Sequence, residues 1–365
     1  MKVAIIGANG FIGTRLVEQF HLGNRHEVVP LVRKPSSLAL PARFAVDWRI
    51  ADALDRESLA AGLRGCDAVV HAAIGDPRQI ELMPEVLCAA AAAAGIRRVV
   101  CLSSASVHGQ APAPGTTDAT PLRTDHALDY NNAKVRAEQS FFAEAARARL
   151  QAFALRPGVV FGPRSRWIAD LAKDLRDGTA WLYRGGDGIC NSIYVDNLVD
   201  AIDVALRAPA GAAGAYLVGD SETVTWREFY LPVAAKLGIP AANIESLDKL
   251  PVFTRTTRDK IERAVASPSI QALLPAVPHR LKQFTKAVLA SGNGPARPSA
   301  WSLPASPKSR ITEELALLQQ CRWKLPHTKA QSGLGYAPST TFADGMVRSL
   351  AWLAFAEGGG DLAAR

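Results

Sequence analysis

The sequence predicts an α/β fold, with a doubly wound parallel sheet followed by a smaller C-terminal lobe. Short apolar runs alternate with segments of helical periodicity through residues 1–160, which is the pattern of strands and crossover helices. A glycine-rich turn follows the first run, and hydroxyl side chains follow a later one. The chain of 365 residues can bury more core than one domain requires, so we expect a second lobe over 161–365, with part of 190–220 returning to the sheet.

The first apolar run, residues 2–6, is too short for a helix and is typical of a buried parallel strand. The turn over 7–13 reads GANGFIG, and a helical pattern follows it. A strand, a glycine-rich turn and a helix N-terminus form an anion site, because free N–H groups face the ligand and missing Cβ atoms let it approach. This context favours a dinucleotide pyrophosphate over a turn that binds nothing. The residues predicted to hold it are Gly7, Asn9, Gly10, Phe11, Ile12 and Gly13.

Two cations follow the second predicted strand, residues 26–32. An acidic residue at this point would accept hydrogen bonds from the adenosine ribose and select NAD, whereas Arg33 and Lys34 suit a 2′-phosphate. We therefore expect NADP(H), with NAD(H) as the alternative if Arg33 stacks on adenine or lies in solvent. Asp52, after the third strand, has two equal interpretations. It accepts from the adenine amino group, or it caps the helix that starts near Asp55.

The next strands are expected over 67–73 and 98–104, and a loop rich in Pro, Ala and Thr leads to a helix that carries Tyr130 and Lys134. At a spacing of four residues both side chains share one helix face, and the ammonium favours the phenolate form of the tyrosine. Such a pair can move a proton while a hydride moves, and Ser104 would donate to the substrate oxygen. Each residue alone suits an ordinary surface position, but together with the dinucleotide site they predict catalysis.

Seven segments in one order resemble the extended short-chain dehydrogenase/reductase superfamily, the group called NAD-dependent epimerase/dehydratase proteins. They are GANGFIG (7–13), DAVVHAA (67–73), LSSASVHG (102–109), YNNAK (130–134), LRPGVVFGP (155–163), IYVDNLVDAI (193–202) and LGYAPSTTFADGM (334–346). The resemblance implies a Rossmann-type sheet and a catalytic set of Ser104, Tyr130 and Lys134. It also implies that Arg33 selects the adenosine phosphate and that Asp52 meets the adenine. Further cofactor contacts are implied for Ala72, Ala73, Tyr130, Lys134, Pro157 and Val159.

By this resemblance the chain is an NAD(P)-dependent oxidoreductase or epimerase that moves a hydride at a secondary alcohol or ketone, with a nucleotide-sugar as first choice. Segments 155–163 and 191–198 also resemble the branch that acts on sterols, flavonols and other apolar alcohols or ketones. A lipophilic substrate near a membrane surface is thus a second hypothesis. A third is an NAD(P)-binding sensor without catalysis, which the intact catalytic set argues against. Epimerisation, dehydration and simple oxidoreduction begin with the same hydride step, so the sequence does not separate them.

The segment 251–310 carries the whole net charge of the protein, +8, because it holds ten Lys and Arg against two acidic residues. Its position indicates a basic, Pro-rich insertion in the C-terminal lobe. Three interpretations remain open: a solvated helical face followed by a linker, a basic amphipathic helix on an anionic membrane, or a lid whose cations hold an anionic substrate. No nucleic-acid motif accompanies the charge, so we expect no nucleic-acid partner.

Five cysteines without C-x-x-C pairing predict reduced, buried thiols, a cytoplasmic location and no metal site. The first predicted strand starts at residue 2, so we expect no signal peptide, and since no apolar run is long enough we expect no membrane span. The expected partner is a small-molecule substrate, with peripheral membrane contact through 251–310 and a homodimer as further options.

Overall fold

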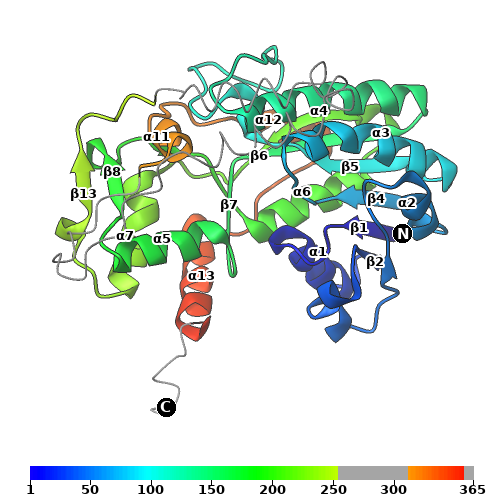
Figure 1. Cartoon of the computed structure of the whole chain (residues 1–365), viewed down its shortest axis with the longest axis horizontal. Coiled ribbons are helices and arrows are strands. Elements are labelled where there is room, and N and C mark those ends of the chain that lie inside the picture. Colours follow the sequence, from blue (N-terminus) through cyan, green and yellow to red (C-terminus); the bar gives the residue numbers. More distant parts are fainter. Residues whose placement is uncertain (254–310, 357–365) are drawn as a thin grey trace, which may run out of the picture. The chain divides into compact units, whose positions relative to one another are not determined.

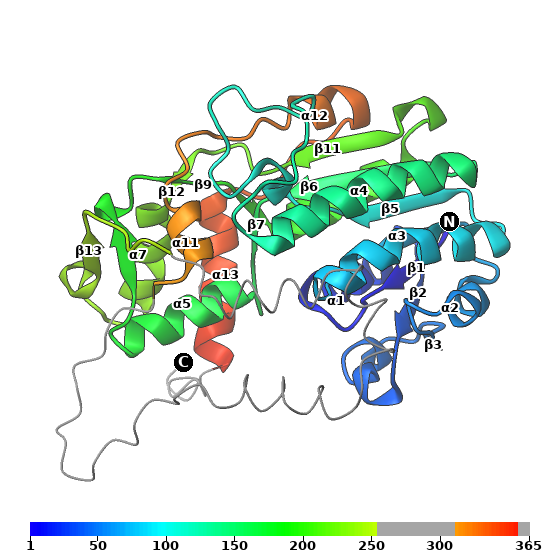
Figure 2. The same cartoon turned by 45° about the horizontal axis from the view of Figure 1, so that its top comes forward.

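The computed structural model describes residues 1–253 and 311–356, so nearly all of the basic segment 251–310 lies outside the described residues. Seven parallel strands form the main sheet, in the order β11-β6-β5-β4-β1-β2-β3; Figure 1 labels the central strands and Figure 2 the edge strands β3 and β11. They are β1 (Lys2–Ile6), β2 (Glu27–Val32), β3 (Arg49–Ile50), β4 (Ala68–His71), β5 (Arg98–Leu102), β6 (Gln151–Pro157) and β11 (Gly214–Val218). The chain winds outward from β1 in one direction and from β4 in the other. The doubly wound sheet is confirmed, with its switch point between β1 and β4.

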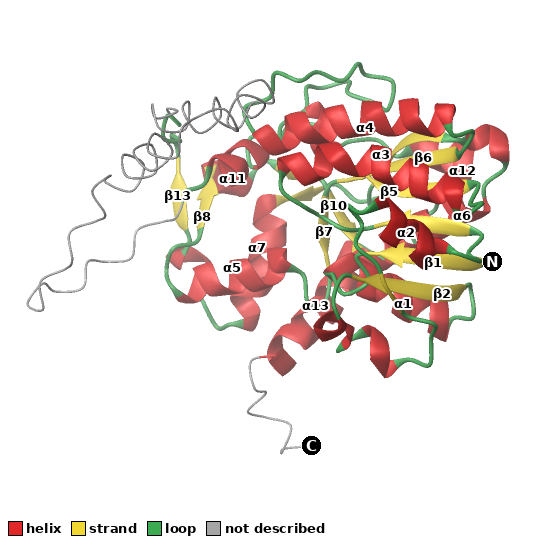
Figure 3. Ribbon diagram, turned by 45° about the vertical axis from the view of Figure 1, so that its right-hand side comes forward, coloured by secondary structure: helices red, strands yellow, loops and turns green. Residues whose placement is uncertain are grey.

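Helices cover both faces of this sheet (Figures 2 and 3). On one face lie α1 (Phe11–Leu22) and α6 (Val195–Arg207), with α12 (Thr328–Leu334) beside them; on the other lie α2 (Arg56–Leu63), α3 (Pro77–Ala93) and α4 (Asp129–Arg147). Because side chains alternate along a strand, Val3 and Ile5 pack toward α1 and α6, whereas Ala4 and Ile6 pack toward α2, α3 and α4. Both faces are buried, which explains why the strands are apolar throughout.

The C-terminal lobe is built around an aromatic core of Phe161, Trp226 and Phe229, against which Phe342 packs. Its helices are α5 (Arg166–Arg176), α7 (Trp226–Lys236), α11 (Glu313–Leu318) and α13 (Phe342–Ala356). Its strands pair as β7 (Val159–Phe161) with β10 (Ser192–Tyr194), β8 (Trp181–Tyr183) with β13 (Glu245–Leu247), and β9 (Ile189–Cys190) with β12 (Val224–Thr225). Short 3-10 helices are η1 (Pro35–Leu38), η2 (Pro41–Arg43), η3 (Ala105–His108), η4 (Arg184–Gly186), η5 (Ala210–Ala212) and η6 (Ala241–Asn243).

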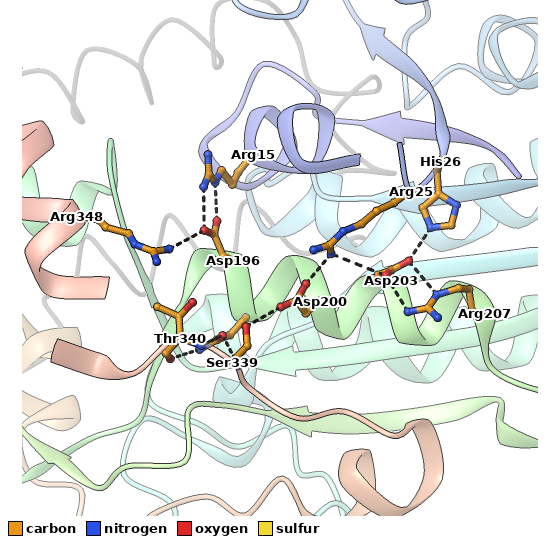
Figure 4. Close-up of polar contacts among 11 residues, drawn as sticks. Arg15, Arg25, His26, Asp196, Asp200, Asp203, Arg207, Ser339, Thr340 and Arg348 are labelled. Atoms are coloured by element: carbon orange, nitrogen blue, oxygen red, sulfur yellow. Dashed lines mark hydrogen bonds and ion pairs between the residues drawn. The ribbon is translucent and has the colours of Figure 1, made fainter. Parts of the chain in front are cut away.

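Acidic side chains on one face of α6 contact basic side chains of α1, of the turn before β2, and of the last helix, α13 (Figure 4). Asp196 accepts from Arg15 of α1 at 2.5 Å and lies 3.6 Å from Arg348 of α13. One turn further on, Asp200 lies 2.6 Å from Arg25. Asp203 then lies 2.7 Å from Nε2 of the buried His26 and also accepts from Arg207. The row joins α1, the turn before β2, α6 and α13, and so links the sheet to the lobe.

Asp203 should contribute a pH-dependent part of the stability. Burial alone would raise the pKa of its carboxyl, but hydrogen bonds from His26 and Arg207 outweigh burial and hold that pKa below its ordinary value. A lowered carboxyl pKa adds stability that is present above the unfolded-state pKa of about 3.9 and is lost as the pH falls through the folded-state value. Asp203→Asn should therefore flatten the loss of unfolding free energy below about pH 4, measured by urea denaturation at a series of pH values. If Asp203→Asn loses unfolding free energy at low pH just as the parent does, the proposed contribution of Asp203 to stability is wrong.

All five cysteines are buried and free, as predicted. Within the ranges 1–253 and 311–356, no helix has the length and apolar character needed to cross a membrane.

Candidate active site

The turn between β1 and α1 is packed so closely that it requires glycine. Gly7 has φ +81°, and a Cβ there would lie 2.7 Å from the backbone N of Ala73. A Cβ on Gly13 would lie 2.1 Å from the carbonyl oxygen of Gly7. The helix begins at Phe11 with no side-chain cap and no acidic residue in its first turn. Its first N–H groups therefore have no side-chain partner, which is the arrangement that an anion site requires.

A cavity of about 260 Å³ lies at the carboxyl edge of the sheet, at the switch point between β1 and β4. The predicted residues that line it are Gly7, Asn9, Arg33, Asp52, Ala73 and Lys134. The predicted residues that lie outside this lining are Gly10, Phe11, Ile12, Gly13, Ala72, Ser104, Tyr130, Pro157 and Val159. The first four belong to the turn and helix start just described, whereas Pro157 and Val159 are buried at the junction of β6 and β7. A cavity beside a glycine-rich turn at the switch point of a doubly wound sheet occupies the place where such sheets bind ligands.

Of the two interpretations of Asp52, the helix cap is wrong. Asp55 caps α2, because its carboxylate accepts from the backbone N of Ser58 at 2.8 Å. Asp52 instead accepts from the backbone N of Leu54 at 3.0 Å and lines the cavity. Arg33 and Lys34 are exposed after β2, and Arg33 lines the same cavity together with Ser37. A cation and a hydroxyl thus face the part of the cavity that follows β2.

Tyr130 and Lys134 lie in the first two turns of α4, as predicted. Lys134 is buried, and its Nζ donates to the carbonyl oxygen of Leu102 at 3.0 Å and lies 5.8 Å from the centre of the Tyr130 ring. Leu102 ends β5, and Ser104 follows it directly in the loop to η3, where its hydroxyl accepts from the backbone N of Ser106 at 3.2 Å. The end of β5 and the start of α4 therefore bring the serine, the phenol and the ammonium to one edge of the sheet.

Comparison with known proteins decides the family. The model of the NAD-dependent epimerase/dehydratase family matches residues 3–219, which is more than half of the chain. The chain belongs to this family. It is 26% identical to the UDP-glucose 4-epimerase of Vibrio cholerae over 66% of this chain and 76% of that one. For the UDP-glucose 4-epimerase of Mycolicibacterium smegmatis the identity is 28%, over 66% and 84%. For the decarboxylating sterol-4-alpha-carboxylate 3-dehydrogenase of Candida albicans it is 27%, over 62% and 72%.

Solved structures of the family share the fold. The dTDP-glucose 4,6-dehydratase of Streptomyces venezuelae, solved with NAD, superposes with a TM-score of 0.69 at 21% identity, over 98% of both chains. The UDP-glucuronic acid 4-epimerase of Bacillus cereus, also solved with NAD, gives 0.66 at 16% identity, over 98% of this chain and 100% of that one. The relatives of this chain are epimerases, dehydratases and dehydrogenases, and it is an NAD(P)-dependent enzyme of the same family.

A buried ion pair behind the site escaped the sequence analysis. The Glu138 carboxylate accepts from Ser103 Oγ at 2.5 Å and from Arg156 Nε at 3.0 and 3.2 Å. Both charged side chains are almost fully buried, at 3% and 5% exposed. The pair fixes the residue next to Ser104 and joins α4 to β6. Glu138 follows Lys134 by four residues, so the helical spacing that identified Tyr130 and Lys134 would also have placed Glu138 on their face.

His71, at the end of β4, is a second cavity residue that the sequence analysis placed only in a strand. Burial, helped by the positive charge of Lys134, lowers its pKa to about 3, so the ring is neutral at physiological pH. Its Nδ1 has no hydrogen-bond partner among the described residues. A neutral imidazole beside Lys134 keeps one positive charge, not two, at this end of the cavity.

Proposed function

We propose that this enzyme transfers a hydride between NADP(H) and a secondary alcohol or ketone of a nucleotide-sugar, with Ser104, Tyr130 and Lys134 as its catalytic residues. The observation that carries the proposal is the buried ammonium of Lys134, held at the cavity wall and 5.8 Å from the centre of the Tyr130 ring. An ordinary surface lysine would lie in solvent. The nucleotide-sugar class is supported by two relatives, which are UDP-glucose 4-epimerases.

Each proposed residue has a defined task. The cofactor, when bound, accepts or supplies the hydride. Ser104 Oγ would donate to the substrate oxygen, and Tyr130 would take or return the proton of that oxygen. The Lys134 ammonium would stabilise negative charge on the phenolate by Coulomb attraction, since Lys134 is buried beside the ring. The carbonyl of Leu102 fixes the ammonium in place.

The proposed cofactor contacts include residues that line the cavity and residues that lie beside it. The turn and the helix start would hold the pyrophosphate, with Ala72 and Ala73 beside it. At one end Asp52 would accept from the adenine, and Arg33 would bind a 2′-phosphate. At the other end Lys134 would bond the nicotinamide ribose, with Pro157 and Val159 flanking the nicotinamide. Burial of all five thiols supports a reducing, cytoplasmic location.

Arg33→Ala should erase most of a preference for NADP(H) over NAD(H). One charge-assisted hydrogen bond to the 2′-phosphate contributes about 1.5–3 kcal/mol, or roughly 10- to 150-fold in affinity. The dissociation constants of NADPH and NADH are measured by fluorescence titration of the parent and the variant. Arg64→Ala serves as the control, since Arg64 is exposed at the end of α2 and lies outside the cavity. Equal affinities for the two cofactors in the parent would refute the NADP(H) preference.

A lipophilic alcohol or ketone is the second candidate substrate. One curated relative is a sterol-4-alpha-carboxylate 3-dehydrogenase, and its identity of 27% is as high as that of the epimerases. Thermal shifts of the NADP(H)-saturated protein with UDP- and dTDP-sugars and with a sterol ketone distinguish the classes, because a ligand of the folded state raises Tm. We expect at least one nucleotide-sugar to raise the Tm of the protein. Stabilisation by the sterol ketone alone would transfer the assignment to the lipophilic class and would favour a membrane-surface role for segment 251–310.

A further inference from the structure

Residues 321–327 lie over the carboxyl ends of β6 and β11, and Lys324 therefore lies at this edge of the sheet. Leu325 packs with Ala105 and Leu217. The Asn191 side chain holds the segment from both sides of Lys324, because its Nδ2 donates to the carbonyl of Trp323 at 3.0 Å and its Oδ1 accepts from the backbone N of Leu325 at 2.8 Å. The backbone of Lys324 is therefore fixed at the sheet edge where the reacting groups lie.

Lys324 faces a small cavity of about 10 Å³, enough for one water-sized atom. The residues that form this cavity with it include Ala105, Gly158, Asn191, Ser192 and Gly219. Ser192 is 1% exposed, and its hydroxyl has no hydrogen-bond partner among the described residues. Nearly all buried polar groups in proteins are paired. A cavity lined by a serine with an unpaired hydroxyl, by Lys324 and by Arg156 is suited to an oxygen acceptor.

The nearby carboxylates are occupied by other donors. Asp220 accepts from the backbone N of Tyr194 at 2.9 and 3.1 Å and from Asn197 Nδ2 at 2.7 Å. Glu222 accepts from the backbone N of Phe342 at 3.0 Å. Neither forms an ion pair with Lys324, and within 1–253 and 311–356 no other acceptor lies within hydrogen-bond distance of its Nζ. Burial lowers the pKa of the Lys324 ammonium, and Coulomb attraction from Asp220 and Glu222 opposes this shift only in part; a bound anion would oppose it further.

We propose that Lys324 and Ser192 form a subsite for one anionic oxygen of the substrate, carried by a carboxylate or a phosphate group. The position supports this, because Ala105 follows Ser104 and Gly158 lies between the two residues proposed to flank the nicotinamide. The inference rests on the proposed function, since it takes Ser104, Tyr130 and Lys134 as the reacting end of the substrate site. It assigns Lys324 a role in substrate specificity and no role in the chemistry.

Two variants test the subsite in different ways. Lys324→Met removes the charge and keeps most of the side-chain volume. Gly219→Ala keeps the charge, but its methyl carbon would lie 3.9 Å from Lys324 Nζ and 3.7 Å from the carbonyl of Ser192, which is ordinary contact distance. Gly219 has no positive φ, so alanine fits its backbone. Lys236→Met, at the exposed end of α7, is the matched control.

Isothermal titration of the NAD(P)-saturated protein uses two probe pairs: UDP against uridine, which lacks the diphosphate, and glucuronate against glucose, which lacks the carboxylate. The parent should prefer the anion of at least one pair by roughly 10-fold or more, the strength of a charge-assisted hydrogen bond. This preference should disappear in Lys324→Met and Gly219→Ala and persist in Lys236→Met. The pair for which the parent prefers the anion shows whether the subsite binds a phosphate or a carboxylate. No preference in the parent, or a preference that survives in Lys324→Met, overturns the subsite. Cofactor binding and Tyr130-dependent turnover, measured separately, test the proposed function on their own.

Discussion

Tyr130→Phe should lower kcat by roughly 10²–10⁴ while the affinity for the cofactor stays near the parent value. The substitution keeps the ring that packs at the start of α4 and removes only the hydroxyl that would carry the proton. Rates on the substrate identified by thermal shift are measured under cofactor saturation, and cofactor affinity is measured by fluorescence titration.

Lys134→Met provides the contrast within the same helix. It should impair both turnover and cofactor binding, because Lys134 lines the cavity and is proposed to bond the ribose as well as stabilise the phenolate. Circular dichroism checks that each variant is folded. Full activity of Tyr130→Phe would refute the catalytic assignment, and normal cofactor affinity in Lys134→Met would remove the ribose contact.

Replacing one partner of the Glu138–Arg156 pair should have the largest effect on stability. Glu138→Leu leaves the Arg156 charge buried without its carboxylate, and breaking such a pair costs about 3–5 kcal/mol. Urea denaturation measures the loss. The double variant Glu138→Leu/Arg156→Met should recover part of it, since an apolar pair of similar volume leaves no buried charge.

The control for this prediction is an ion pair at the surface. Arg123 and Asp125 lie 2.5 Å apart, but their side chains are 74% and 64% exposed. Water screens such a pair, so Asp125→Ala should leave the free energy of unfolding nearly unchanged. A small effect of Glu138→Leu, similar to that of Asp125→Ala, would show that the buried pair is not important for stability.

The sheet was predictable because its determinants are local in sequence. Apolar runs mark the strands. Gly7 and Gly13 mark a turn whose backbone is packed so closely that a Cβ would clash at either position. Tyr130 and Lys134 were predictable for the same reason, since four residues on a helix bring side chains together. The position of Arg33 and Asp52 beside the cavity was predictable because both follow strands, although only the structure distinguished Asp52 from the true cap, Asp55.

The rest of the site depends on contacts that no local pattern reveals. Ser103, Glu138 and Arg156 come from a strand end, a helix and another strand, and they meet only once the sheet is assembled. Ser192 and Lys324 are separated by more than a hundred residues, and their shared cavity exists only because the C-terminal segment crosses the sheet edge. A lysine in a Pro- and Trp-containing loop has no sequence signal of its own.

The most direct test of the account is the binding of a reduced dinucleotide to the purified protein. We expect saturable binding of NADPH with one site per chain, seen as fluorescence energy transfer from the tryptophans, and competition by NADP⁺. We also expect Arg33→Ala to weaken the binding of NADPH more than the binding of NADH. If neither NADPH nor NADH binds at millimolar concentration while the protein is folded, the cavity at the switch point is not a dinucleotide site, and the proposed hydride transfer is wrong.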